Sequence, residues 1–134
     1  MIKQLAHICL RTEDLEKTSE YYCQALGMER FFDFERQGSL FGYYLKAGRN
    51  TFIEVFKGDP GAEGNIRHVA LEVDDMDEAI ERIRRHGAAA TDKKLGADQS
   101  WQSWTEDPNG VKIELHQYTE DSSQRTGRTC VVNW

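Results

Sequence analysis

The chain has 134 residues and a formal net charge of −6, and 39% of its residues are hydrophobic. This length fits one compact domain, and the acidic balance argues against nucleic acid or an anionic membrane surface as the main partner. No apolar run approaches the roughly 18 residues that a membrane helix needs, the first residues do not resemble a signal peptide, and the three cysteines lack a disulfide framework. We therefore expect a cytoplasmic protein with reduced thiols.

The first half of the chain predicts a strand, a helix and three further strands. Alternating side chains predict the first strand from Gln4 to Leu10. A helix is expected from about Leu15 to Leu26, with its N-cap at Thr12 or Asp14. The three strands that follow are predicted at Met28 to Arg36, Leu40 to Ala47 and Thr51 to Phe56.

The second half repeats this order after the turn-rich stretch from Lys57 to Gly64. Period-two alternation predicts a strand within Asn65 to Asp75, and apolar residues at helical spacing predict a helix that begins at Met76 and ends at His86-Gly87. Three strands are expected at about Ala88 to Lys93, Gln99 to Thr105 and Val111 to Gln117, with a hairpin turn at Glu106 to Gly110. The tail, residues 119–134, is polar and then apolar, which predicts a role in stability or dimer contacts more than in chemistry.

Each half carries a histidine on its opening strand and a glutamate on its closing strand. His7 aligns with His68 at an offset of 61 residues (68 − 7), and Glu54 aligns with Glu114 at an offset of 60 (114 − 54). A repeat of this period determines the architecture. We predict an α+β fold in one domain, 1–134, with two βαβββ modules at 1–58 and 65–118. Their curved mixed sheets should surround a cleft, with the helices outside.

The repeated side chains share the cleft face of their strands. Ile8, Val69 and Ile113 are apolar neighbours, so strand alternation places the histidines and glutamates on the opposite face. Two imidazoles and two carboxylates suit one divalent ion of Ni, Zn, Co, Mn or Fe. Any one of these residues alone is equally well explained as a core histidine or an ion-paired glutamate, but their duplication favours a metal site. Its predicted ligands are His7, Glu54, His68 and Glu114.

These motifs resemble the vicinal-oxygen-chelate superfamily, and most closely glyoxalase I. The segment that runs from His7 through Arg11 to Tyr21-Tyr22 is similar to the opening strand and helix of that family. The stretch E-D-P-N-G-V-K-I-E-L, residues 106–115, is similar to its E-D-P-x-G-x-x-I-E-L signature. The resemblance covers about residues 2–118.

The resemblance implies an enzyme that isomerises the hemithioacetal of methylglyoxal and glutathione through an enediolate. The ion would act as a Lewis acid, and Glu54, Glu114 or both would be the catalytic base. Arg11 occupies the position of a family arginine that binds a glutathione carboxylate, whereas Gly58 replaces a family asparagine that also contacts glutathione. Trp104 is a candidate wall of the substrate pocket, although core packing explains it equally well.

Two other functions stay open at this point. One is a metal-dependent epimerase or lyase that acts on another α-hydroxycarbonyl substrate. The other is a metal-free small-molecule-binding protein similar to the bleomycin-resistance relatives, against which the four candidate ligands argue. We also predict a homodimer, because one βαβββ half cannot bury both faces of its sheet. If the modules pair between chains, His7 and Glu54 would meet the second histidine and glutamate of a partner chain.

Overall fold

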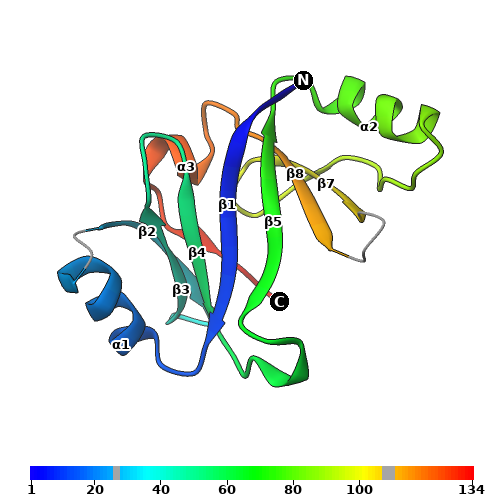
Figure 1. The fold of residues 1–134 in the computed structure, drawn as a ribbon. Helices are drawn as coiled ribbons and strands as arrows, with labels where there is room; N and C mark the ends of the chain where they lie inside the picture. Colours follow the sequence, from blue (N-terminus) through cyan, green and yellow to red (C-terminus); the bar gives the residue numbers. More distant parts are fainter. Residues whose placement is uncertain (26–27, 107–110) are drawn as a thin grey trace.

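The computed structural model describes residues 1–25, 28–106 and 111–134. The predicted helix end at Leu26-Gly27 and most of the predicted hairpin turn at Glu106 to Gly110 lie outside the described residues. Within the described part, one mixed sheet of nine strands curls into a half-barrel in the order β6-β7-β8-β5-β1-β4-β3-β2-β9 (Figure 1). The predicted α+β class, with a curved mixed sheet and helices outside it, is confirmed.

The first half of the sheet is built from the N-terminal strands. Its elements are β1 (Ile2–Thr12), α1 (Leu15–Glu20), a π-helical turn η1 (Tyr21–Ala25), β2 (Glu29–Arg36), β3 (Ser39–Lys46) and β4 (Phe52–Lys57). Helix α1 begins as expected, because the Asp14 carboxylate accepts a hydrogen bond of 2.9 Å from the backbone N–H of Lys17. Its α-helical part ends early, where Tyr21, Tyr22 and Cys23, which are weak helix formers, follow one another.

The second half follows the short 3₁₀ turn η2 (Gly61–Glu63). Its elements are β5 (Ile66–Val73), α2 (Met76–Arg85), β6 (Lys94–Leu95), β7 (Trp101–Glu106) and β8 (Lys112–Gln117). The prediction of a strand at Ala88 to Lys93 is wrong, because that segment forms only an isolated bridge between Ala90 and Thr105. Hydrogen bonds from the Ser103 hydroxyl to the Thr91 carbonyl, and from the Trp104 N–H to the Thr91 hydroxyl, hold it in an irregular path beside β7.

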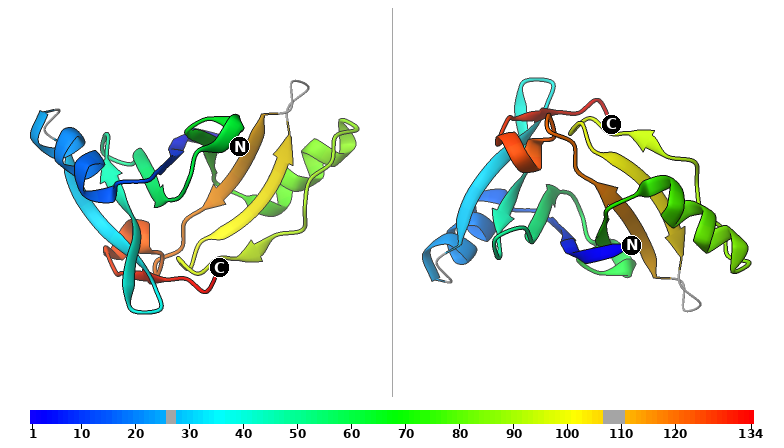
Figure 2. Two further views of the ribbon diagram at one scale, coloured as in Figure 1. Left: turned by 90° about the horizontal axis from the view of Figure 1, so that it is seen from below. Right: turned by 90° about the horizontal axis from the view of Figure 1, so that it is seen from above.

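The two halves meet at strands β1 and β5. These strands pair antiparallel, so the two predicted sheets are one continuous sheet. Figure 2 shows α1 and α2 on the outside of the curl, at opposite ends. Leu15 of α1 packs on Tyr43, Leu45 and Val55, and α2 packs on Val73 and neighbouring strand residues. Among the described helices, none is long and apolar enough to span a membrane.

The C-terminal segment returns to the concave side of the sheet. It contains α3 (Ser123–Thr126) and β9 (Cys130–Val131), and β9 pairs in parallel with β2. In both views of Figure 2 this red segment crosses the open side of the half-barrel, opposite β1 and β5. Cys130 and Val132 are buried against an aromatic cluster on the concave face. That cluster contains Phe32, Phe34, Tyr44 and Phe52.

Candidate metal centre

The predicted ligands come from the central strands of the sheet. His7 lies on β1, Glu54 on β4, His68 on β5 and Glu114 on β8, which are neighbours in the order β8-β5-β1-β4. Strand register brings them together, because Cys9 of β1 is the partner of both Glu54 and His68. His7 is completely buried, both glutamates are buried, and the His68 side chain is 12% exposed.

The donor atoms of these side chains converge on one point within a single chain. The Nε2 atoms of His7 and His68 lie 3.0 Å apart. Oε2 of Glu114 lies 3.2 Å from each of these two nitrogens. Oε1 of Glu54 lies 3.4 Å from His7 Nε2 and 3.7 Å from His68 Nε2. The structure therefore brings all four predicted ligands together, and no partner chain is needed to complete the group.

This arrangement fits a divalent metal ion. Nitrogen and oxygen ligands bound at about 2.0–2.2 Å to one tetrahedral or octahedral ion lie about 2.8–3.6 Å from their neighbours. Four of the five spacings around His7 and His68, 3.0–3.4 Å, lie in that range, and the fifth, from Glu54 Oε1 to His68 Nε2, is slightly longer at 3.7 Å. The donor set of imidazole nitrogens and carboxylate oxygens is one that first-row metals accept. The residues present therefore fit the group that the sequence motifs imply.

The electrostatics of the group also suit a bound cation. Burial alone would lower the pKa of His7, but the nearby Glu54 and Glu114 carboxylates outweigh it and raise that pKa to about 10. Burial would raise the pKa of Glu114, yet His116, His68 and His7 hold it well below its ordinary value. The buried carboxylates of Glu54 and Glu114 thus favour a positively charged group, such as a metal cation, between them.

A second layer of buried polar side chains surrounds the ligands. The Tyr44 hydroxyl lies 2.9 Å from His7 Nδ1. His116, which shares the cleft face of β8, places its Nε2 3.9 Å from Glu114 Oε1 and 3.3 Å from Asp98 Oδ2. The potential ligands thus form two overlapping groups that share His7: one adds Glu54 and His68, and the other adds Glu114 and His116. His116 could be placed on this face by strand alternation, whereas Tyr44 and Asp98 have no signal in the sequence.

Two adjoining pockets open onto the site. The inner pocket, of about 400 Å³, is lined by the ligands Glu54, His68 and Glu114 together with residues of the C-terminal segment. The outer pocket, of about 740 Å³, continues from His68 toward the ends of β1 and β7. Trp104 lines both pockets, and its ring stands edge-on to His68 at a centroid distance of 4.9 Å. Trp104 therefore lines the cleft, and its contact with a substrate stays a prediction.

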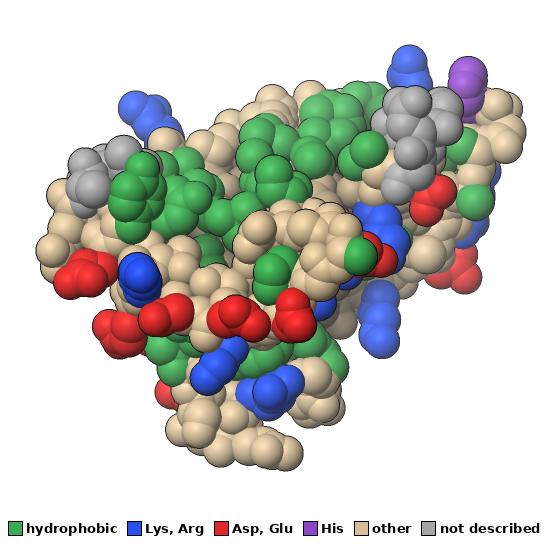
Figure 3. Space-filling model, turned by 60° about the horizontal axis from the view of Figure 1, so that its bottom comes forward, with side chains coloured by type: hydrophobic (Ala, Val, Ile, Leu, Met, Phe, Trp, Pro, Cys, Tyr) green, Lys and Arg blue, Asp and Glu red, His purple; other side chains and the backbone are tan. Residues whose placement is uncertain are grey.

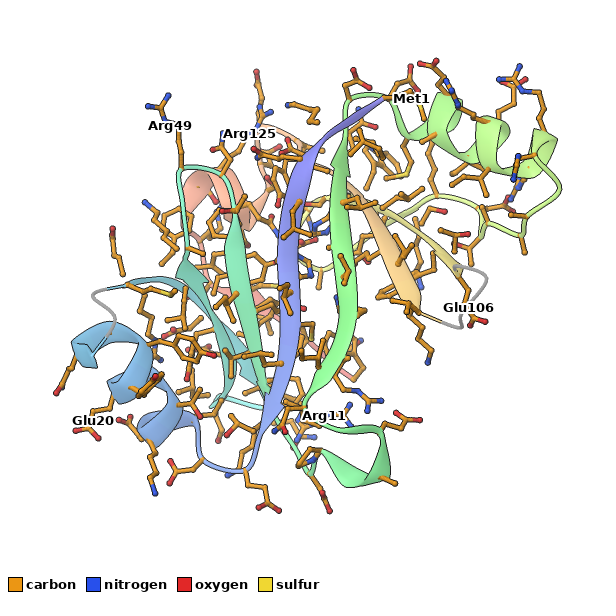
Figure 4. The ribbon with its side chains drawn as sticks, viewed as in Figure 1. Met1, Arg11, Glu20, Arg49, Glu106 and Arg125 are labelled. Carbon is orange, nitrogen blue, oxygen red and sulfur yellow. The ribbon has the colours of Figure 1, made fainter. Side chains whose placement is uncertain are left out.

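Basic side chains gather at the outer pocket. Arg11, Arg67 and Lys112 line it, with Glu106 as an acidic neighbour. Figure 4 labels Arg11 at the end of β1. Arg67 pairs with Glu63 at 2.5 Å, but within the described residues the Arg11 and Lys112 side chains have no ion-pair partner. This local positive charge stands out in a chain whose net charge is −6, so the pocket favours an anionic ligand.

Gly58 makes room for the Arg11 side chain. A Cβ atom at Gly58 would lie 2.7 Å from Arg11 Cδ, which is too close for both atoms to stay in place. The backbone N–H of Gly58 donates a hydrogen bond of 2.8 Å to the Thr12 carbonyl and fixes this approach. Glycine at this position therefore lets Arg11 lie along the wall of the outer pocket.

The C-terminal segment contributes more to the site than the sequence suggested. Cys130, Val132 and Asn133 line the inner pocket, and Trp134 lines both pockets. The Trp134 ring packs edge-on against Phe56 at a centroid distance of 5.3 Å. The segment that is predicted to serve stability or dimer contacts therefore also forms a wall of the cleft.

Comparisons with known proteins agree with this architecture. Residues 4–115 match the family described as the Glyoxalase/Bleomycin resistance protein/Dioxygenase superfamily. The lactoylglutathione lyase of Salmonella typhimurium is 33% identical over 124 residues, which are 84% of this chain and 90% of that protein. A probable lactoylglutathione lyase of Synechocystis is 31% identical over 123 residues, with coverage of 84% and 94%. A crystal structure of methylmalonyl-CoA epimerase from Mycobacterium tuberculosis is similar in fold, with a TM-score of 0.74, 23% identity and coverage of 88% and 89%.

Proposed function

The chain belongs to the Glyoxalase/Bleomycin resistance protein/Dioxygenase superfamily, and we propose that it is a metal-dependent lyase or isomerase similar to glyoxalase I. The observation that carries this proposal is that one oxygen of Glu54 and one of Glu114 each lie 3.2–3.7 Å from the Nε2 atoms of His7 and His68, which are themselves 3.0 Å apart. A purely structural cluster would gain little from burying two carboxylates against two histidines. The same cost argues against a metal-free binding protein.

The proposed ligands would hold one divalent ion of Ni, Zn, Co, Mn or Fe. When bound, such an ion polarises substrate oxygens and stabilises the negative charge of an enediolate. The protein's own part is proton transfer: one glutamate carboxylate takes the proton from the carbon next to the substrate carbonyl and returns it to the neighbouring carbon. Glu54 and Glu114 both border the inner pocket, so either reaches a substrate there. Such base catalysis typically contributes about 10²- to 10⁴-fold.

Each of the two pockets would bind a different part of the substrate. The reacting carbons belong in the inner pocket, against the carboxylates, and an anionic group of the substrate belongs in the outer pocket beside Arg11. Trp104 separates the two and would exclude water from the reacting carbons. The hemithioacetal of methylglyoxal and glutathione meets these requirements, because glutathione carries carboxylates at a distance from its thiol. Lactoylglutathione lyase is also the name of the relatives at 31–33% identity.

A second candidate function uses the same site on another substrate. Gly58 offers no side chain to a glutathione amide or carboxylate, and the basic groups of the outer pocket accept other anions equally well. An epimerase or lyase that acts on a different anionic α-hydroxycarbonyl or acyl substrate would need the same base and the same ligands. The solved structure of an epimerase with this fold is consistent with that alternative.

An activity assay on metal-loaded protein separates these candidates. We expect the protein to convert the hemithioacetal to a thioester of a 2-hydroxy acid. The absorbance of the thioester measures this reaction. A parallel panel in D₂O contains other α-hydroxycarbonyl compounds and acyl thioesters, and deuterium at the α-carbon reports proton abstraction. Deuterium uptake in the panel without any turnover of the hemithioacetal would favour the second candidate. No proton exchange with any compound at full metal loading would contradict both.

We further propose that the protein is a homodimer that uses the outer face of β1 and β5. Three apolar pairs face each other across this seam, and of their residues Leu71 is partly buried against the cluster under α2. The pairs are Leu5 with Leu71, Ile8 with Val69 and Leu10 with Ile66. Leu5 is 41% exposed and Ile66 is 63% exposed. Figure 3 shows hydrophobic side chains gathered over the upper part of the molecule, on the side that carries β1 and β5 in Figure 1. A second copy would bury this surface.

A further inference from the structure

One side chain of the C-terminal segment, outside the family match at 4–115, contacts residues that surround the candidate metal centre. Gln124 of α3 is buried, and it makes hydrogen bonds to residues that lie far from it in the sequence. We propose that Gln124 is a positioning residue that holds His7 and Glu114 in their metal-binding orientation. This inference rests on the metal site of the proposed function, and it adds to that site a residue that ties its two halves together.

The orientation of the Gln124 amide follows from its neighbours. Its Nε2 lies 2.6 Å from Oδ2 of Asp98, and a carboxylate accepts hydrogen bonds, so the amide must donate there. On the other side, the Ser100 hydroxyl donates to Gln124 Oε1 at 3.0 Å. The same Nε2 lies 3.4 Å from the Tyr44 hydroxyl oxygen. The two hydrogens of one amide group are therefore directed to Asp98 and to Tyr44.

The first branch leads from Gln124 through Tyr44 to His7. A histidine that binds a metal through Nε2 carries its proton on Nδ1, and a second side chain usually accepts that proton. Here the acceptor is the Tyr44 hydroxyl, 2.9 Å from His7 Nδ1. Tyr44 is completely buried and stacks on Phe32 with ring centroids 4.4 Å apart. Gln124 holds the hydroxyl end of this ring and so fixes the position of the acceptor.

The second branch leads from Gln124 through Asp98 and His116 to Glu114. Oδ2 of Asp98 accepts from Gln124 and lies 3.3 Å from His116 Nε2. The His116 ring is almost fully buried, and its Nε2 lies 3.9 Å from Glu114 Oε1. The backbone N–H of Ser100 donates to the other oxygen of Asp98 at 3.0 Å, which keeps that carboxylate in place. Loss of the Gln124 amide would remove the hydrogen bond to Oδ2, the Asp98 oxygen that faces His116, while Ser100 still holds Oδ1.

The two branches end on ligands from different halves of the sheet. His7 belongs to β1 and Glu114 to β8, whereas Gln124 belongs to a short helix that follows both halves. Because each branch depends on the same NH₂ group, a single substitution should disturb two ligands at once. A side chain that served only stability would change the melting temperature but not the geometry of the ligands.

The test compares variants of the full-length chain for metal binding without substrate. Gln124→Leu keeps a similar volume and removes every hydrogen bond, and Gln124→Glu keeps the shape but replaces the donating NH₂ by a carboxylate next to Asp98. Ser122→Ala is the matched control, because Ser122 is buried beside the same helix but its hydroxyl donates only to the Thr119 carbonyl. Zinc and cobalt affinities are measured by chelator competition, and the visible spectrum of the Co(II) protein reports ligand geometry.

We expect both Gln124 variants to bind metal about 10- to 100-fold more weakly and to show an altered Co(II) spectrum, while Ser122→Ala stays close to the wild type. If Gln124→Leu does not fold, Gln124→Glu decides the question. A folded Gln124 variant with wild-type affinity and an unchanged Co(II) spectrum would overturn the positioning role. A wild-type protein that takes up no metal would instead refute the proposed function, and this outcome is read from the wild-type sample alone.

Discussion

The Nε2 atoms of His7 and His68 face each other at 3.0 Å, although the residues are 61 positions apart in the chain. Each atom comes from the equivalent strand of one half of the sheet, and the antiparallel seam between β1 and β5 brings the two strands side by side. The repeat in the sequence thus becomes a pair of ligands that point at one another. The predictions below follow from this pair and from the residues around it.

Removal of either imidazole should abolish stable metal binding. His7→Ala or His68→Ala deletes a nitrogen ligand and leaves two buried carboxylates that face a single histidine. His86→Ala is the control, because His86 is exposed at the end of α2 and lies outside the cleft. Metal content after reconstitution and dialysis is the measurement. Full occupancy in both cleft variants would show that these histidines are not ligands.

Substitution of Gly58 should weaken substrate binding without loss of metal. In Gly58→Ala the new Cβ would lie 2.7 Å from Arg11 Cδ and push that side chain from the outer pocket. Loss of a charge-assisted hydrogen bond of about 1.5–3 kcal/mol should raise KM roughly 10- to 100-fold, with little change in kcat. Gly48→Ala is the matched control, since its Cβ would approach only the Thr51 hydroxyl, also at 2.7 Å. An Arg11→Ala background should remove most of the Gly58 effect, and an additive effect would contradict this explanation.

Deletion of residues 129–134 should lower stability more than metal affinity. It removes β9 and uncovers the cluster of Phe32, Phe34 and Tyr44, but it leaves Gln124 in place. Loss of the apolar surface that Cys130 and Val132 bury against this cluster costs on the order of 3 kcal/mol, so the melting temperature should fall by roughly 10 °C. Deletion of residues 119–134 also removes Gln124 and should weaken metal binding as well. Equal metal affinity in the two truncated proteins would argue against a role of Gln124.

The sequence was informative where a feature is local and periodic, and uninformative where it is not. Strand alternation around Ile8, Val69 and Ile113 placed the histidines and glutamates on one face, and the structure brings these side chains together. Asp98 and Gln124 follow no period, because their partners are reached by tertiary folding of irregular segments. The prediction of a strand at Ala88 to Lys93 was wrong for a related reason. There, the backbone pairs with β7 only at one isolated bridge, and side-chain hydrogen bonds to Thr91 supplement it.

A charged side chain on the outer face of β1 and β5 should produce monomers that still bind metal. Leu5→Asp or Ile66→Asp places a carboxylate on the exposed apolar face of β1 and β5, where a second copy would have to bury it. Light scattering at micromolar concentration should show the monomer mass, and metal content should stay at the wild-type level because all four proposed ligands lie in one chain. Val131→Asp is the control, because Val131 is 66% exposed but lies on β9, away from this face. This variant should remain dimeric. A monomeric wild type would refute the dimer.

Substitution by glutamine should have different effects at the two glutamates, on kcat at one and on metal affinity at the other. Glu114 contacts His7 and His68 through Oε2, and its Oε1 faces His116, so both of its oxygens are held. Glu54 contacts the same two histidines through Oε1, at the longer distances of 3.4 and 3.7 Å. We therefore expect Glu54 to be the carboxylate that moves to take the substrate proton. Glu54→Gln should lose about 10²- to 10⁴-fold in kcat at full metal loading, because glutamine keeps the size but not the basicity.

Glu114→Gln should instead lose mainly metal affinity and regain most of its activity when metal is in excess. Rates are measured across a metal titration, so that weak binding and slow chemistry are separated for each variant. The reverse pattern, with Glu114→Gln slow at saturation and Glu54→Gln restored by metal, would assign the base to Glu114. Near-full activity of both variants at saturation would mean that neither glutamate abstracts the proton. In that case the enediolate mechanism would have to use another group of the inner pocket.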